Sequence, residues 1–139
     1  MPLINEDQVE LQGIDWFKEL GYNYKNGYDI SPDSENPERD DFRKVILEER
    51  LSSAIKRINP DIPDKTINNS IIQILNPNIP GLFNCNREIH AWITKGLKVT
   101  YMKDDQEIGH LLKLIDFDNI DNNDWLIVNQ FEVKGDKRL

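Results

Sequence analysis

Up to Gly96, apolar residues recur every three or four positions within four segments of the chain. This spacing puts apolar side chains on one face of an α-helix, so it predicts amphipathic helices. Asn-Pro pairs and glycines at the ends of the pattern predict where the helices stop. The predicted helices cover residues 6–20, 48–58, 63–75 and 82–95.

The first predicted helix has a clear start and end. Asn5 is expected to cap its N-terminus, and Gly21 follows its last turn. A glycine inside a helix costs about 1 kcal/mol relative to alanine, so Gly13 predicts that another backbone approaches closely. The stripe expected to be buried consists of Val9, Gly13, Phe17 and Leu20, widened by Ile14 and Trp16.

After Gly96 the pattern changes from helical to alternating, which predicts strands. The expected strands are residues 97–102, 108–115 and 125–133, with a turn at 103–106. A further short strand over residues 22–25 precedes the turn dipeptide Asn26-Gly27. The sequence therefore predicts a single α+β domain over residues 1–139, with about four helices followed by an antiparallel meander of three strands.

Composition narrows the class of protein. The chain has 17 basic and 25 acidic residues in 139, a net charge of −8, which excludes a generally basic nucleic-acid coat protein but not a nuclease with a local binding patch. One cysteine, Cys85, excludes an intrachain disulfide. No segment resembles a secretory signal or a membrane span, so we expect a cytoplasmic protein without a membrane partner.

Motifs that carry chemistry are sparse. His90 and His110 lack the spacing of a helical zinc pair, and there is no Walker A or other phosphate-binding glycine loop. Asp116 and Asp118 could ligate a hard cation, but we favour acidic side chains that cap the turns of a loop. Two small basic groups could contact phosphate, although a solvated surface is the default expectation: Arg39, Arg43 and Lys44, and Lys134, Lys137 and Arg138.

The order of segments is more informative than any motif. An opening helix that ends in Trp16–Tyr22 is followed by several short segments, some of them apolar and some containing Asn-Pro, and by Asn84–His90. The most specific part is the last, Asn122–Phe131, which reads Asn-Asn-Asp-Trp-Leu-Ile-Val-Asn-Gln-Phe. The other segments are Asp29–Asp33, Glu35–Arg39, Val45–Leu51, Ile58–Pro60 and Leu114–Asn119. This string resembles, over nearly the whole chain, the N-terminal region of the R subunit of type I restriction enzymes.

The resemblance implies a nuclease domain of the PD-(D/E)xK type, followed in the full subunit by ATP-driven motor domains. Mg²⁺ and ATP would be cofactors of that full subunit, and none is expected for this chain alone. Its partners would be DNA and the methylation and specificity subunits. Glu10, on the opening helix, matches the acidic residue that faces the metal site. Asn129 and Gln130 are amides in a mostly apolar predicted strand, which is unusual, so we expect them to orient neighbouring loops or to contact DNA.

The family continues beyond this point with Pro-Asp and Glu-x-Lys, which position Mg²⁺ and the attacking water. The sequence ends at Leu139 before these motifs, so we expect a fragment with an incomplete restriction-endonuclease-like core that does not cleave DNA alone. One alternative is a non-catalytic module that docks on a DNA-processing partner. A second is an acidic protein that competes with DNA for a basic groove, which the charge of −8 permits.

Overall fold

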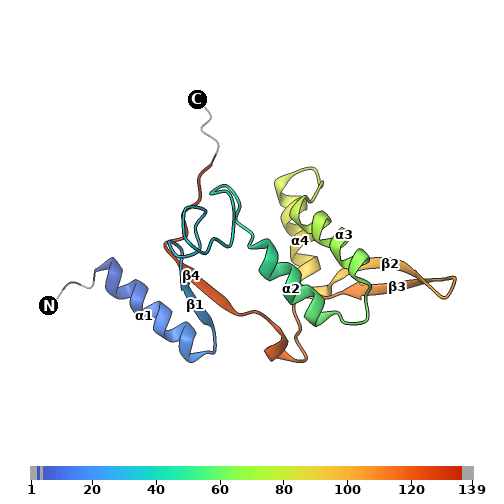
Figure 1. Cartoon of the computed structure of the whole chain (residues 1–139), viewed down its shortest axis with the longest axis horizontal. Coiled ribbons are helices and arrows are strands. Elements are labelled where there is room, and N and C mark those ends of the chain that lie inside the picture. Colours follow the sequence, from blue (N-terminus) through green and yellow to red (C-terminus); the bar gives the residue numbers. More distant parts are fainter. Residues whose placement is uncertain (1–2, 4, 136–139) are drawn as a thin grey trace. The chain divides into compact units, whose positions relative to one another are not determined.

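The computed structural model describes residue 3 and residues 5–135, and it divides them into two compact units (Figure 1). Unit 1 comprises residues 1–48 and 125–139, and unit 2 comprises residues 49–124. The α+β class is confirmed, and a single domain over residues 1–139 stays a prediction. No helix in the described part of the chain is long and apolar enough to cross a membrane.

Unit 1 is built on one helix and two strands that lie far apart in the sequence. Helix α1 (Glu6–Glu19) packs on strands β1 (Asn23–Asn26) and β4 (Leu126–Asn129), which pair in parallel (Figure 1). Asn5 caps α1 as expected, because its side chain accepts from the backbone N–H of Gln8 at 2.9 Å. Gly21 ends the helix with a φ of 97°, a conformation that glycine adopts without strain.

The predicted three-stranded meander is wrong in its third strand. β4 pairs with β1 in parallel and not with the hairpin that precedes it. Strands adjacent in sequence usually pair with each other, and this tendency misled the prediction. A parallel pair needs a long connection, and the chain supplies it by placing the whole of unit 2 between the two strands.

The predicted buried face of α1 is confirmed at Ile14 and wrong at most of its other positions. Only Ile14 is buried, with 7% of its surface exposed, whereas Val9 and Leu20 are 61% and 75% exposed. A Cβ added to Gly13 would meet no atom within 4 Å, so no backbone approaches this residue closely. The aromatic end of the helix does pack, since the Phe17 ring meets Tyr22 edge-on with centroids 5.1 Å apart.

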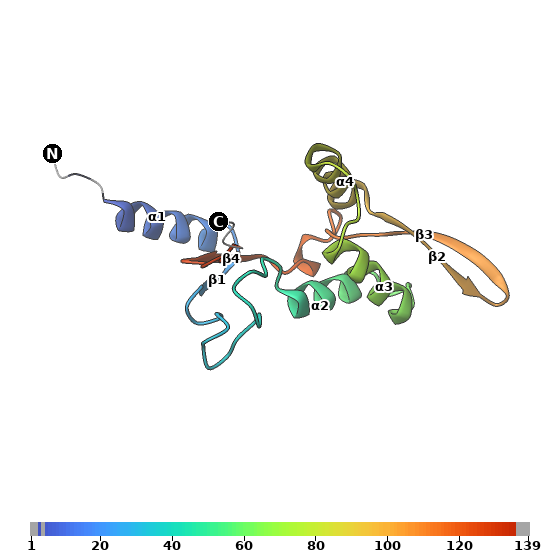
Figure 2. The same cartoon turned by 90° about the horizontal axis from the view of Figure 1, so that it is seen from above.

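Unit 2 contains three helices and a hairpin. Helices α2 (Glu48–Ile58), α3 (Asp64–Leu75) and α4 (Leu82–Lys95) match the predicted helices to within one residue. Strands β2 (Leu97–Lys103) and β3 (Gln106–Leu112) form an antiparallel hairpin that extends beyond α3 (Figure 2). The core of this unit consists of Ile55, Ile62, Ile67, Ile71, Trp92, Leu97 and Leu112.

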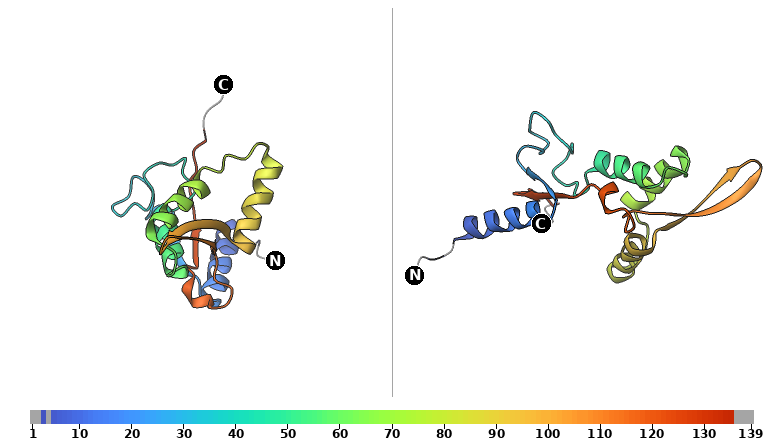
Figure 3. Two further views of the ribbon diagram at one scale, coloured as in Figure 1. Left: turned by 90° about the vertical axis from the view of Figure 1, so that its right-hand side faces the viewer. Right: turned by 90° about the horizontal axis from the view of Figure 1, so that it is seen from below.

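The hairpin turn has the geometry that a twisted two-stranded ribbon favours. Asp104 and Asp105 have φ values of 52° and 62°, as in a two-residue turn whose own twist matches that of the strands. The ribbon twists along its length (Figure 3). The expected turn at 103–106 is therefore confirmed, with the two aspartates at its tip.

Asn59 joins α2 to the end of the hairpin. Its side-chain amide donates to the carbonyl oxygens of Ile55 and Lys113, both at 2.8 Å. Its side-chain oxygen accepts from the backbone N–H of Lys113, also at 2.8 Å. Asn59 is 6% exposed, and a buried amide needs such partners. The residue predicted only as a helix stop thus also holds two elements of the core together.

Asp116 organises the loop between β3 and β4. Its carboxylate accepts from the backbone N–H groups of Asp118 and Asn119 at 3.0 and 2.9 Å, and from the side-chain amide of Asn122 at 3.0 Å. These contacts confirm that Asp116 caps the turn. The Asn119 N–H, followed by the Asn122 amide, holds the pKa of the Asp116 carboxyl below its ordinary value.

Replacing Gly27 is expected to destabilise unit 1. A Cβ on Gly27 would lie 2.1 Å from the carbonyl oxygen of Gln130, so Gly27→Ala should lower the free energy of unfolding by about 1–3 kcal/mol. Gly13→Ala is the matched control, because it meets nothing within 4 Å and should raise that free energy by about 0.5–1 kcal/mol. Urea unfolding followed by circular dichroism measures both, and a neutral Gly27→Ala would contradict the close approach.

Asp116→Asn should destabilise unit 2 in a pH-dependent way. The substituted amide would turn an N–H toward the Asn122 amide, which is itself a donor. Because the pKa of Asp116 is lower in the folded state than in the unfolded state, the ionised carboxylate stabilises the fold at pH values above the unfolded-state pKa of about 3.9. This stabilisation is lost as pH falls through the folded-state pKa. The stability gap between wild type and Asp116→Asn should therefore narrow below pH about 3.9.

Thermal unfolding between pH 7 and pH 2.5, a range chosen to span that value of about 3.9, measures the gap. Asp121→Asn, an exposed substitution in the same loop, is the control and should leave stability unchanged. A gap that stays constant across the range would contradict the role of the Asp116 charge.

Candidate functional site

Glu10 and Gln130, both singled out in the sequence, lie together in unit 1 although 120 residues separate them. The side-chain amide of Gln130 donates to both carboxylate oxygens of Glu10, at 3.0 and 3.2 Å. α1 supplies Glu10, and Gln130 follows the last residue of β4. The packing of α1 on the β1–β4 pair therefore brings the two side chains into contact.

The backbone around Gln130 is unusual. Gln130 has a φ of 52°, in the left-handed region that non-glycine residues seldom adopt. Gly27 lies directly against it, and the Gly27 N–H donates to the Asn129 carbonyl at 2.8 Å. The Tyr28 hydroxyl donates to the side-chain oxygen of Gln130 at 3.5 Å. Left-handed residues of this kind cluster at functional sites, where the surrounding structure holds them in place.

Asn129 has a partner of its own in the adjacent strand. Its side-chain oxygen accepts from the Tyr24 hydroxyl at 2.7 Å, and β1 and β4 place the two residues in adjacent strands. The sequence could not identify Tyr24 and Tyr28 as partners of these amides, because the pairing of β1 with β4 was not foreseen. The Asn26-Gly27 dipeptide was the available signal, since it marked the turn that meets Gln130.

Glu10 keeps acceptor capacity for a further group. Each carboxylate oxygen can accept about two hydrogen bonds, and Gln130 uses one on each. Within residue 3 and residues 5–135, however, no group of three His, Cys, Asp or Glu side chains comes together to hold a metal. One carboxylate does not by itself provide the set of oxygens that Mg²⁺ needs, so the described residues do not fit a complete magnesium site.

The other predicted candidates that the structure describes do not join this pair. Lys137 and Arg138 lie outside the described residues. His110 stacks on Tyr101, with ring centroids 6.4 Å apart, and Asp118 lies 3.6 Å from the Lys113 ammonium. These contacts are typical of surface packing and not of a ligand site.

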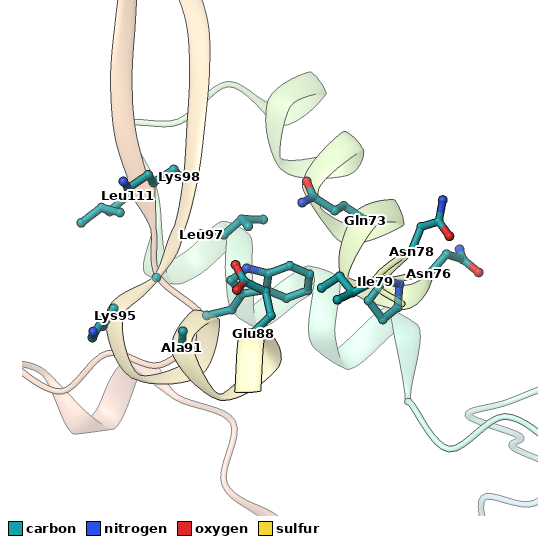
Figure 4. Close-up of a pocket in the computed structure, with 13 residues that line it drawn as sticks. Gln73, Asn76, Asn78, Ile79, Glu88, Ala91, Lys95, Leu97, Lys98 and Leu111 are labelled. Carbon is teal, nitrogen blue, oxygen red and sulfur yellow. The ribbon is translucent and has the colours of Figure 1, made fainter. Parts of the chain in front are cut away.

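Unit 2 contains a cavity of about 820 Å³ that no motif in the sequence marked. Figure 4 shows amide side chains from the end of α3 and the following loop, Gln73 and Asn78 among them, and Lys95 from α4. Trp92 and Leu97 contribute apolar surface. The volume is in the range of small-molecule sites, and the charged residues that line it are Glu88, Lys95 and Lys98.

Comparison with known proteins gives consistent results. The chain is 36% identical over 136 residues to the putative type I restriction enzyme MjaIXP endonuclease subunit of Methanocaldococcus jannaschii, covering 94% of this chain and 12% of that protein. It is 26% identical over 140 residues to the type I restriction enzyme HindI endonuclease subunit of Haemophilus influenzae, covering 99% and 13%. No solved structure gives a significant match.

The chain thus spans about an eighth of the length of these relatives. The matches extend over nearly all of the chain and include the segment that contains Glu10 and the one that contains Gln130. The family model described as the type I restriction enzyme R protein N terminus matches residues 4–139, and the chain belongs to this family.

Proposed function

We propose that this chain is the N-terminal part of an R subunit that cleaves foreign DNA, and that Glu10 is one carboxylate of its nuclease site. The observation that carries the proposal is the hydrogen-bonded contact between Glu10 and Gln130, the latter held in a left-handed conformation. The family and the printed names of the relatives, which are endonuclease subunits, support it.

The β1–β4 pair is the expected start of the nuclease sheet. Parallel sheets are normally larger than two strands and covered on both faces. All four residues of β4 are only half-buried, and within the described residues β4 pairs with β1 alone. Further strands of the same subunit would complete the sheet and supply the Asp and Glu-x-Lys motifs that the family resemblance implies.

In this proposal Gln130 fixes the orientation of the Glu10 carboxylate, and Glu10 presents negative charge and free acceptor positions to the completed site. Mg²⁺ would supply the activation of water for phosphodiester hydrolysis when bound by the full subunit. ATP would act in the motor domains of that subunit. The methylation and specificity subunits are the proposed partners, and DNA is the proposed substrate.

A second candidate function is a docking module without chemistry of its own. The observation in its favour is the exposed apolar surface of α1, where Val9, Trp16 and Leu20 are 61%, 61% and 75% exposed. Apolar residues gathered on one surface are typical of protein–protein contacts. Such a module would bind a DNA-processing partner through α1 and would not need the Glu10 charge.

Glu10→Gln separates the two candidate functions. The substituted amide oxygen still accepts from Gln130 but the negative charge is lost. In the assembled restriction enzyme, DNA cleavage should fall by about a hundredfold or more, as when one preorganised electrostatic group is removed from an active site. ATP hydrolysis should be unchanged, because the motor domains are intact.

The matched control is Glu19→Gln, at the other end of α1, which changes the same charge at an exposed position. Cleavage should be normal in this variant. If Glu10→Gln also cleaves normally, Glu10 has no part in the nuclease site and the docking module becomes the better account.

We also propose that Lys137 and Arg138 contact DNA phosphates. Replacing both by alanine in the full subunit should weaken DNA binding similarly for all sequences and reduce the slope of log affinity against log salt by about 2. Fluorescence anisotropy at several salt concentrations measures the slope. Lys103→Ala, at the end of β2, is the control; an unchanged slope in the double variant would exclude both residues from the DNA contact.

A further inference from the structure

Arg39 is a buried arginine in the long loop that connects β1 to α2. Only 5% of its surface is exposed. Arginine is seldom buried to this extent, because removing its charge from water is costly unless the group is well paired. The contacts that compensate for this burial indicate what the residue does.

The guanidinium of Arg39 ties this loop to the segment that follows β4. Its Nη1 donates to the carbonyl oxygens of Phe42 and Lys44, at 3.1 and 2.8 Å. Its Nη2 donates to the carbonyl oxygen of Glu132. The guanidinium also lies over the ring of Phe131, 3.9 Å from its centroid, which adds a cation–π contact. A planar group with several fixed donors suits this arrangement and an ammonium does not.

Phe131 and Glu132 directly follow Gln130, so Arg39 holds the backbone on the C-terminal side of the left-handed residue. Gly27 holds it on the other side, through its hydrogen bond to the Asn129 carbonyl. A left-handed conformation is unfavourable for a residue that has a Cβ, so it persists only where neighbouring contacts impose it. Gln130 is therefore fixed between two anchors, and Arg39 is one of them.

The arginine is not explained by stability alone. A buried charged group is often replaced by apolar residues of similar volume without loss of stability. The buried Nε of Arg39 has no hydrogen-bond partner within residue 3 and residues 5–135. This lowers the stability of the fold in a way that an apolar residue would not. What an apolar residue could not reproduce is the set of three directed bonds to carbonyl groups.

We propose that Arg39 is a positioning residue of the nuclease site, which keeps Gln130 in the conformation that orients the Glu10 carboxylate. This inference rests on the proposed function of Glu10. It predicts that Arg39 acts on the catalytic step and not on DNA binding, because no contact of Arg39 recorded in the structure reaches beyond unit 1.

The test compares Arg39→Ala and Arg39→Lys with wild type in the assembled enzyme. A misplaced catalytic group commonly costs about a hundredfold in rate, so kcat for DNA cleavage should fall by tens to about a hundredfold while KM for DNA changes by less than about threefold. Lysine keeps the charge but not the three bonds, so it should not restore the rate. Ethylguanidinium added to Arg39→Ala should restore part of it.

A second readout does not depend on activity. The side-chain amide signals of Gln130 in ¹⁵N–¹H NMR spectra report its hydrogen bond to Glu10. They should move in Arg39→Lys toward the positions they take in Glu10→Ala, where the acceptor is absent. Arg43→Ala, an exposed arginine of the same loop whose side chain is 63% exposed, is the control and should change neither the rate nor the signals.

Unchanged kcat and unchanged Gln130 signals in both Arg39 variants would overturn the proposal. So would unfolding of both variants, since Arg39 would then be structural only. If Glu10→Gln cleaves DNA normally, the proposed function fails instead, and the Gln130 signals still decide whether Arg39 holds that residue in place.

Discussion

The parallel pairing of β1 with β4 is the constraint on which unit 1 depends. It joins residues 23–26 to residues 126–129 across the whole of unit 2. Parallel pairing is entropically costly to form because a long loop must close. Because of this pairing, Gln130 at the end of β4 lies against Gly27 in the turn after β1. The Gln130 side chain also reaches Glu10 on α1, so the three residues are neighbours.

Local sequence patterns predicted the helices well, because capping and apolar periodicity are properties of neighbouring residues. α2 and α4 begin and end at the predicted residues, and Asn5 and Gly21 act as expected at the two ends of α1. The pairing of β4 could not be predicted in the same way, since it depends on which strand elsewhere in the chain forms the more stable pair with it. The apolar β4 fits an antiparallel hairpin or a parallel pair equally well.

The candidate site was predicted in part. Glu10 was named from the family resemblance and Gln130 as an amide in a mostly apolar strand, but nothing in the sequence indicated that their side chains bond to each other. The burial of Arg39 was not predicted, because the residue stands in a polar loop among charged residues where a solvated side chain is the ordinary expectation. Its burial depends on the ring of Phe131 and on carbonyl groups from the two chain segments that form unit 1. These are the carbonyl groups of Phe42, Lys44 and Glu132.

The central claim is that Glu10 and Gln130 act as one unit in DNA cleavage, and a double-mutant cycle tests it most directly. Cleavage rates of the assembled enzyme are measured for Glu10→Ala, Gln130→Ala and the double variant. Groups that act together are non-additive, so the account predicts that the double variant is no slower than Glu10→Ala alone. Losses that multiply, as for two independent residues, would contradict it.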